Sequence, residues 1–217
     1  GRDLGLAGTW NSERIPFLVL LIPVFSGIFL ISGFILGRGR IFSDLGKILR
    51  MHGRLPTDFF DTASPAGGLF NMGIMGMIGW GYVMLVGGDF NGPVLGGILT
   101  IVGFAAFGKQ PKNAVPLMAG VALSCLVFGK DFAAPGPLLA ALFATTLAPL
   151  TGEFGIPVGI VAGFIHLLIV ERTAAWHGGI NLYNNGFAGG LTATLLITVI
   201  EWYKSNRGNR FGGRKKK

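Results

Sequence analysis

The chain has 217 residues, of which 51% are hydrophobic and only 13% are charged, and its mean hydropathy is +0.61. Soluble domains carry about 25% charged residues, so this composition excludes an ordinary soluble domain and predicts a protein of the lipid bilayer. The net charge of +8 comes largely from basic clusters beside apolar segments, which is typical of the positive-inside rule rather than of nucleic-acid binding. The single cysteine, Cys125, excludes an intrachain disulfide framework.

The apolar residues are distributed in about seven segments, which predicts an all-α, polytopic membrane protein. A complete crossing needs about 20 apolar residues, and several of these segments are shorter. We therefore expect the shorter ones to be tilted, extended into their flanks or re-entrant. The predicted segments in chain order are 15–36, 66–86, 93–107, 113–128, 136–150, 155–170 and 186–203.

The basic residues predict an orientation and four parts of the chain. If all seven segments cross, most of the 18 Lys and Arg residues lie on one side, which the positive-inside rule makes cytoplasmic, together with the C-terminus. The N-terminus is then external. We expect either that a further span precedes it in a longer protein or that residues before Gly1 are simply missing. The parts are 1–36 with the first span, 37–61 as a basic cytoplasmic loop, 62–203 as a repeat-containing membrane domain and 204–217 as a basic cytoplasmic tail.

The basic loop carries an apolar stripe at helical spacing, formed by Ile41, Phe42, Leu45, Ile48 and Leu49. This stripe predicts an amphipathic helix on the cytoplasmic membrane surface, with an ordinary connecting loop as the alternative. We expect some of the basic side chains around the membrane domain to contact anionic lipid. These are Arg50, Arg54, Arg210 and Arg214.

An aromatic-Asn-x-Gly-x-x-Gly motif occurs twice, at residues 70–76 and 183–189, each time where an apolar segment begins. An odd number of crossings separates the two copies, which predicts an internal inverted repeat. Backbone that leaves the helical conformation in lipid must be buried in protein or line a water-filled cavity. We therefore expect a solute pathway at the paired motifs.

A second repeat places an Asp-Phe-x-x-Pro sequence before two apolar segments, with Asp89 and Pro93 in the first copy and Asp131 and Pro135 in the second. Asp is a good helix cap, and Pro fits the first turn of a helix. We expect both aspartates to cap helices rather than to bind ions.

The candidate pathway residues offer amide groups, aromatic walls, small size or an ionisable ring. They are Phe70, Asn71, Gly73, Asn91, His166, Tyr183, Asn184, Asn185 and Gly186. Asparagine amides donate and accept hydrogen bonds, which suits an amide-like or hydroxylated solute. No Asp, Glu, Lys or Arg stands at the centre of an apolar segment. This pattern favours a small neutral solute, or an ion held by main-chain groups.

Alternatives stay open for these residues. Asparagine also caps helices and Gly-x-x-Gly also packs them, so the motifs can serve assembly of the fold alone. His166 is either a proton relay or pore-lining group, or a neutral imidazole that satisfies a neighbouring carbonyl. Three scattered histidines without a carboxylate or thiol at ligand spacing predict no metal site.

Residues 64–196, above all 89–93, 103–109 and 177–190, resemble an uncharacterised family of bacterial multi-span membrane proteins that carry a domain of unknown function. The resemblance implies a helical fold in the bacterial inner membrane but no activity. Members of that family are about twice this length, so the chain resembles one half, the C-terminal one. Residues 90–92 and 183–186 are similar, to a smaller extent, to the repeats of urea transporters.

These observations favour a channel or facilitator for a small neutral polar solute, working as a homo-oligomer or with a second similar chain. The alternatives are a membrane scaffold or accessory subunit of a larger complex, and an ion-coupled carrier half that needs a partner. The sequence contains no nucleophile elbow, phosphate-binding loop, zinc-binding helix or dinucleotide fingerprint. We therefore expect no catalytic residues, no cofactor and no nucleic-acid partner.

Overall fold

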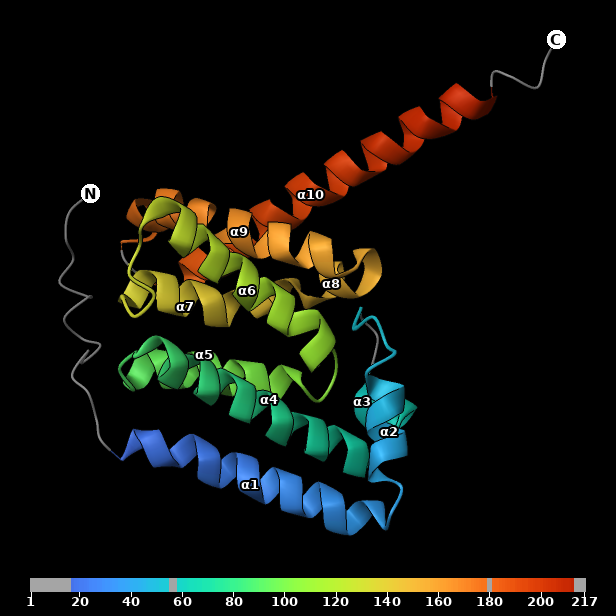
Figure 1. The fold of residues 1–217 in the computed structure, drawn as a ribbon, viewed down its shortest axis with the longest axis vertical. Coiled ribbons are helices and arrows are strands. Elements are labelled where there is room, and N and C mark those ends of the chain that lie inside the picture. Colours follow the sequence, from blue (N-terminus) through green and yellow to red (C-terminus); the bar gives the residue numbers. More distant parts are fainter. Residues whose placement is uncertain (1–16, 55–57, 179–180, 213–217) are drawn as a thin grey trace.

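The computed structural model describes residues 17–54, 58–178 and 181–212, which form helices joined by short connections (Figure 1). Within these residues the fold is all-α, as the composition predicts. The helices are α1 (Leu18–Gly37), α2 (Ile41–Ile48), α3 (Phe59–Thr62), α4 (Pro65–Val86), α5 (Gly92–Phe104), α6 (Pro111–Phe128), α7 (Pro135–Ala144), η2 (Thr145–Leu147), α8 (Ala148–Phe154), α9 (Ile156–Thr173), η3 (Ala174–His177) and α10 (Asn181–Gly212).

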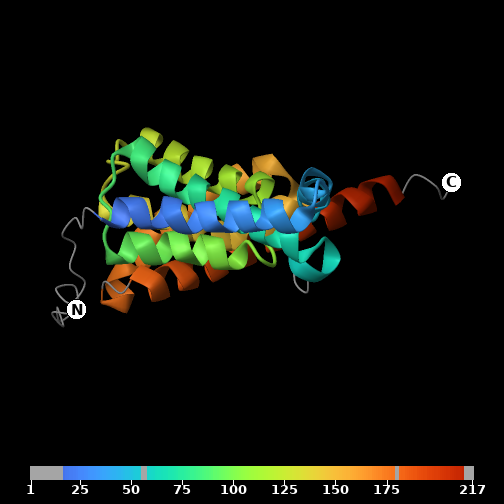
Figure 2. The ribbon, with the colours of Figure 1, turned by 90° about the horizontal axis from the view of Figure 1, so that it is seen from below.

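Six helical segments of the described residues are long and apolar enough to cross a membrane, which confirms a polytopic helical membrane protein. One of them is composite, because α7, η2 and α8 together form the segment Pro135–Phe154. The shorter helix α5 has 13 residues and corresponds to one of the short segments expected from the sequence. The helices α1, α4 and α6 lie roughly side by side, and α10 is inclined to them and extends beyond the bundle (Figures 1 and 2).

Two helix pairs, α1 with α4 and α6 with α9, make the most extensive contacts in the bundle. Both contacts depend on glycine. A Cβ atom on Gly33 of α1 would lie 2.7 Å from the carbonyl oxygen of Ala66, and one on Gly163 of α9 would overlap the main chain of Leu117. Since lipid gives no hydrophobic driving force between helices, close packing of backbones is a main source of attraction. These glycines therefore allow the two pairs to form.

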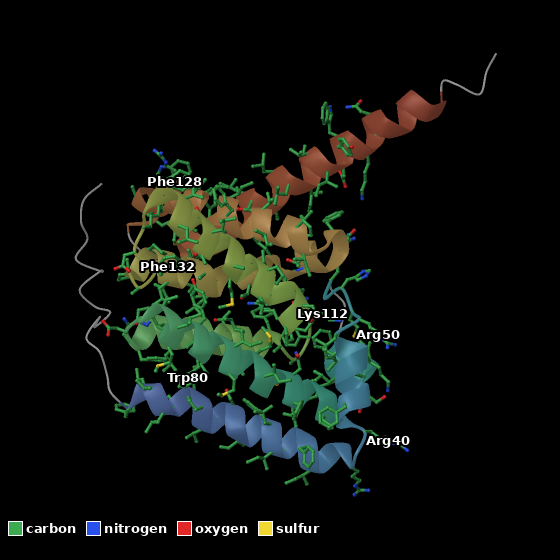
Figure 3. All side chains as sticks on the ribbon, viewed as in Figure 1. Arg40, Arg50, Trp80, Lys112, Phe128 and Phe132 are labelled. Carbon is green, nitrogen blue, oxygen red and sulfur yellow. The ribbon has the colours of Figure 1, made fainter. Side chains whose placement is uncertain are left out.

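A proline inside α1 is compensated by a tryptophan on α4. Pro23 has no N–H, so the carbonyl of Val19, four residues earlier, loses its usual helical donor. Trp80 Nε1 donates to this carbonyl at 2.8 Å, and the Trp80 side chain lies on the α1 side of α4 (Figure 3). The hydrogen bond satisfies a polar group that lipid could not satisfy.

Helix α2 lies beside the N-terminal part of α4, in the stretch where the apolar stripe occurs. Ile41 and Ile48 are fully buried, whereas Phe42 is exposed. Asp44 accepts a hydrogen bond of 2.7 Å from the hydroxyl of Ser64, the residue that caps α4. This hydrogen bond, together with one from Lys47, holds the pKa of Asp44 below its ordinary value. Much of the stripe thus packs on protein, and Phe42 stays exposed.

One end of the bundle, which we name the basic end, contains α2, α3, the α5–α6 turn and the end of α8 (Figure 1). Arg40, Arg50 and Lys112 gather at this end, while Phe128 and Phe132 lie at the opposite end (Figure 3). The charge asymmetry that the sequence predicts is therefore visible in the arrangement of these side chains.

The arginines expected to contact lipid occupy different places. Arg50 is exposed at the basic end, and Arg54 forms an exposed ion pair with Glu153 at 3.2 Å. Arg210 lies within α10, and Arg214 lies outside the described residues. Contact of these residues with anionic lipid stays a prediction.

Both Asn-Gly motifs lie inside continuous helices, so the expectation that irregular backbone would occur at them is wrong. Residues 70–76 belong to α4, and residues 183–189 belong to α10, which begins at Asn181. Gly73 and Gly76 of the first motif are in close contact with α1, whereas a Cβ on Gly186 or Gly189 of the second motif would meet open space. None of these glycines ends its helix. The interruption falls instead in the segment of α7 and α8, where η2 separates the two helices.

The Asp-Phe-x-x-Pro repeats also cap differently from the prediction. Asn91, not Asp89, is the N-cap of α5, and its side chain accepts from the N–H of Val94 at 3.0 Å. Asp131 accepts from the N–H of Ala133 in the turn before α7, whose own N-cap makes no side-chain hydrogen bond. The prolines do occupy the first turns of α5 and α7, as expected.

Candidate functional site

The segment formed by α7, η2 and α8 is the central element of the bundle. Over an apolar stretch of 18 residues in this segment, 72% of the residues are buried inside the protein, against 22% for such stretches in α1 and in Leu182–Asn206 of α10. Helix α7 packs against α5, α6, α9 and α10. An interruption in this segment is therefore surrounded by protein, which is where a membrane protein tolerates irregular backbone.

The interruption has a local cause in the sequence. Pro149 stands in the first turn of α8 and cannot donate to the carbonyl of Thr145, four residues earlier. The N–H of Ala148 donates to that carbonyl instead, which tightens the chain into the short 3-10 helix η2. The change of helix type leaves Thr145 at the boundary between two helix segments.

The side chain of Lys109 reaches this boundary from the α5–α6 turn. Its Nζ donates a hydrogen bond of 2.8 Å to the hydroxyl of Thr145, which in turn donates to the carbonyl of Leu142 at 2.7 Å. The same ammonium group lies 5.0 Å from the centre of the Phe104 ring. Lys109 is 4% exposed and Thr145 is fully buried. A basic side chain thus meets the central interruption inside the protein.

The α5–α6 turn that carries Lys109 is held by asparagine side chains. Asn71 on α4 donates to the carbonyls of Ala105 and Lys109 at 2.7 and 2.9 Å. Asn113 donates to the carbonyl of Gly108 at 2.8 Å. The buried Oδ1 of Asn71 has no hydrogen-bond partner among the described residues. These bonds fix the turn by its main chain, and thereby fix the direction of the lysine.

Burial changes the acid–base chemistry of Lys109. Removal of the ammonium group from water disfavours its charged form and lowers the pKa of Lys109 from its ordinary 10.5 to about 7. No Asp or Glu of the described residues forms an ion pair with it. The amine therefore changes charge near neutral pH, which an exposed lysine does not do.

A second polar cluster joins α9 to α10. Asn184 donates to the carbonyl of Val170 at 2.8 Å and accepts from the hydroxyl of Thr173 at 2.6 Å. His166 Nε2 lies 3.2 Å from Asn185 Oδ1, and all four side chains that form the cluster are buried. The last carbonyls of a helix lack donors within it, and Asn184 supplies one for α9. We refer to His166, Thr173, Asn184 and Asn185 as the α9–α10 cluster.

The remaining candidate residues lie apart from both groups. Phe70 is half-buried and Gly73 is buried, and each contacts α1. Asn91 caps α5. Tyr183 is 69% exposed, and Gly186 is exposed with open space where a Cβ would stand. The aromatic residues of the two motifs therefore do not face each other within this chain.

The structure brings together only part of the expected pathway. His166 and Asn185 are in contact and Asn184 is adjacent, whereas Asn71, on α4, binds the α5–α6 turn. Between them lies the interruption, because η2 packs against α6, α9 and α10 and receives Lys109. The hydrogen bonds favour the alternative reading of Asn71 and Asn184, in which the motif asparagines hold neighbouring helices together.

Two residues of the site escape the sequence patterns. The positive-inside rule assigns Lys109 to a basic turn facing water. The rule misses its inward direction, because that direction depends on Asn71, 38 residues away. Thr145 is one of many polar residues within apolar segments. Its one local signal is Pro149, since a proline inside an apolar segment frees the carbonyl four residues before it.

Comparison with known proteins identifies a family but no activity. A family model described as "Protein of unknown function (DUF1576)" matches residues 37–202, and the chain therefore belongs to this family. The match contains the α5–α6 turn, the interruption and the α9–α10 cluster. No match was found among the curated proteins or the solved structures.

Proposed function

We propose that this membrane protein is a transporter of channel or facilitator type for a small polar solute. Its pathway passes the interruption of the central segment, where Thr145 and Lys109 meet. The protein works without a cofactor and is not an enzyme. Its basic end faces the cytoplasm and contacts anionic lipid, in keeping with the positive-inside rule.

The observation that carries this proposal is the break between α7 and α8 with a buried basic side chain directed at it. Discontinuous membrane helices form the solute sites of many transporters, because their ends present polar groups at membrane depth. A break of this kind is unfavourable on a surface that faces lipid, since lipid cannot satisfy the polar groups that a break exposes. Ionisable side chains buried in a membrane protein also mark function, because their burial is costly.

Lys109 changes one premise of the sequence argument. A neutral solute was favoured because charged residues are missing from the centres of the apolar segments. Lys109 belongs to a turn and not to an apolar segment, yet its amine is buried beside one. Small neutral solutes remain the first probes, and the amine extends the range to solutes with a charge.

Solute-driven swelling of proteoliposomes tests the proposal, with urea, formamide, acetamide, glycerol and water compared against empty vesicles. The informative variant is Thr145→Val, which keeps the shape of the side chain and removes the hydroxyl that Lys109 contacts. The matched control is Thr100→Val on α5. The hydroxyl of Thr100 also donates to a carbonyl of its own helix, at 2.8 Å, but faces outward.

We expect selective uptake by the wild type and by Thr100→Val, and uptake reduced by about tenfold or more in Thr145→Val, as for loss of a buried hydrogen-bonding group. If folded protein passes none of these solutes and no methanesulfonate either, the proposal fails. An accessory role in a larger complex would then be favoured, and the protein would be expected to copurify with an unrelated complex.

A further inference from the structure

We propose that Lys109 and Thr145 form a binding site for a small monovalent oxyanion, such as the carboxylate of a short organic acid. This inference rests on the proposed function, because the oxyanion is a group of the transported solute. The site is formed by a buried amine, a buried hydroxyl and an aromatic ring at the interruption of the central segment.

The amine has more donors than the protein accepts. An ammonium group carries three N–H donors and has no acceptor. One donates to Thr145, whose own hydrogen is committed to the carbonyl of Leu142, and the ring of Phe104 lies beside the charge. The structure gives the other two donors no protein acceptor among the described residues. Buried donors are normally paired, so a ligand oxygen is the natural partner.

The charge also lacks a counter-ion. Among the described residues, the acidic groups of the basic end are Asp44 on α2, Asp58 and Asp61 at α3, and Glu153 at the end of α8. Glu153 pairs with Arg54, and Asp44 pairs with Lys47. None of these carboxylates forms an ion pair with Lys109. Buried charges are stable when paired, so an anion that entered the site would supply the missing counter-ion of Lys109.

The surroundings of the site set the size and charge of the ligand. The other charged groups on the elements around the turn have both signs, with Lys112 on α6 and with Asp58 and Asp61 at α3. The N–H of Phe59 in α3 donates to the carbonyl of Ala106 in the turn at 3.0 Å, and none of these groups forms an ion pair with Lys109. The buried amine itself carries a single charge, which balances one negative charge and not two. A short monovalent oxyanion therefore fits best.

Binding of an anion requires the protonated amine. The pKa of Lys109 near 7 means that the empty site is partly uncharged at neutral pH. A bound anion stabilises the ammonium form, so anion and proton bind together. Such a site takes up an anion with a proton, and the pair carries no net charge into the protein interior.

The test uses the purified 217-residue chain and sodium methanesulfonate, an oxyanion that stays ionised at every pH used and crosses lipid poorly. Binding is measured by calorimetry at pH 6 and pH 8, with sodium chloride as the comparison salt. Three variants are compared with the wild type. Lys109→Met removes the amine, Lys109→Arg fixes its charge, and Lys112→Met removes an exposed lysine from the same turn as a control.

We expect the wild type and Lys112→Met to bind methanesulfonate about tenfold more tightly at pH 6 than at pH 8, because the protonated fraction of an amine with a pKa near 7 falls by about tenfold. Lys109→Met should not bind it, and Lys109→Arg should lose the pH dependence. Unchanged binding in Lys109→Met, pH-independent binding in the wild type, or equal binding of chloride would overturn the inference.

Uptake of urea and of labelled methanesulfonate in the same proteoliposomes separates this inference from the proposed function. Passage of both, with methanesulfonate uptake lost in Lys109→Met, supports the two together. Passage of urea alone leaves the transport function standing and removes the oxyanion site. Passage of neither removes the transport function, and the calorimetry then decides on the site by itself.

Discussion

The α5–α6 turn and the α9–α10 cluster both bury polar side chains beside the central segment, but they differ in how far those side chains are satisfied. In the α9–α10 cluster, Asn184 makes two hydrogen bonds and Nε2 of His166 contacts Asn185, while Nδ1 of His166 is without a partner among the described residues. At the α5–α6 turn, the ammonium of Lys109 has one neutral acceptor and no counter-ion among the described residues. The cluster thus joins α9 to α10 and leaves one ring nitrogen unused, whereas the turn leaves two donors of a basic group without a protein acceptor among the described residues.

This difference indicates that burial of polar residues in a membrane protein does not by itself mark a solute site. A buried polar group that is fully hydrogen-bonded contributes to the specificity of packing, whereas a buried group with spare donors or acceptors carries a cost that only function explains. The paired asparagines attract notice in the sequence, yet their hydrogen bonds are mostly used within the fold.

The largest effect is expected from Asn184→Leu. The change removes the donor to the Val170 carbonyl and the acceptor of the Thr173 hydroxyl, and each buried group left unpaired costs about 1 to 3 kcal/mol. We expect loss of folded protein in size-exclusion chromatography and a lower melting temperature. Asn206→Leu, at an exposed position of α10, is the control. A folded Asn184→Leu protein of wild-type stability that loses flux would instead place Asn184 in the pathway.

Lys109→Met should act in the opposite direction and raise stability. Burial lowers the pKa of Lys109 to about 7, so between pH 7 and its ordinary value of 10.5 the unfolded chain binds more protons than the folded chain. The wild type should therefore become more stable as the pH rises through this window. We expect Lys109→Met to melt about 2 to 4 °C higher at pH 7 and to lose this pH dependence. A variant that is less stable than the wild type at pH 7 would show that the amine is structural.

His166→Leu tests whether the α9–α10 cluster takes part in transport. The change removes one hydrogen bond, to Asn185, and a ring nitrogen that has no partner among the described residues. We expect the free energy of unfolding to fall by about 1 kcal/mol, with flux retained at every pH. Flux that disappears in a folded variant would support the proton-relay interpretation and remove the distinction between the two regions.

The smallest effect is expected at the surface of the basic end. Arg54 and Glu153 form an exposed ion pair at 3.2 Å that links the connection before α3 to α8. Exposed pairs contribute about 0 to 1 kcal/mol. Glu153→Gln should therefore change the melting temperature little and leave methanesulfonate binding as in the wild type. A marked gain in binding would mean that Glu153 acts on Lys109 after all.

The membrane fold follows from the sequence because its cause is local. Length and apolar composition determine where a chain can cross lipid, so segment 66–86 corresponds to α4 (Pro65–Val86) and segment 113–128 to α6 (Pro111–Phe128). Helix α10 begins earlier than predicted. Glycine and asparagine are common where a helix starts, so the sequence places the start within the motif, whereas the helix continues through these residues.

The site could not be predicted in the same way, because its cause is not local. The direction of Lys109 depends on Asn71, and its partner Thr145 lies 36 residues away. Charge and hydropathy describe the surroundings of a residue along the chain, and both assign this lysine to water. The predicted pathway residues were selected for being polar and repeated, which describes helix contacts as well as it describes a solute site.

The most direct test of the central claim is whether water-borne molecules reach Thr145. The chain has one cysteine, Cys125, which is buried, so Cys125→Ala gives a background without thiols for Thr145→Cys and for the control Thr192→Cys. Thr192 is also fully buried but hydrogen-bonds within α10. A pathway at the interruption predicts that a small hydrophilic thiol reagent labels Thr145→Cys in proteoliposomes and reduces flux, while Thr192→Cys stays unlabelled. Equal protection of both cysteines in an actively transporting protein would contradict the account.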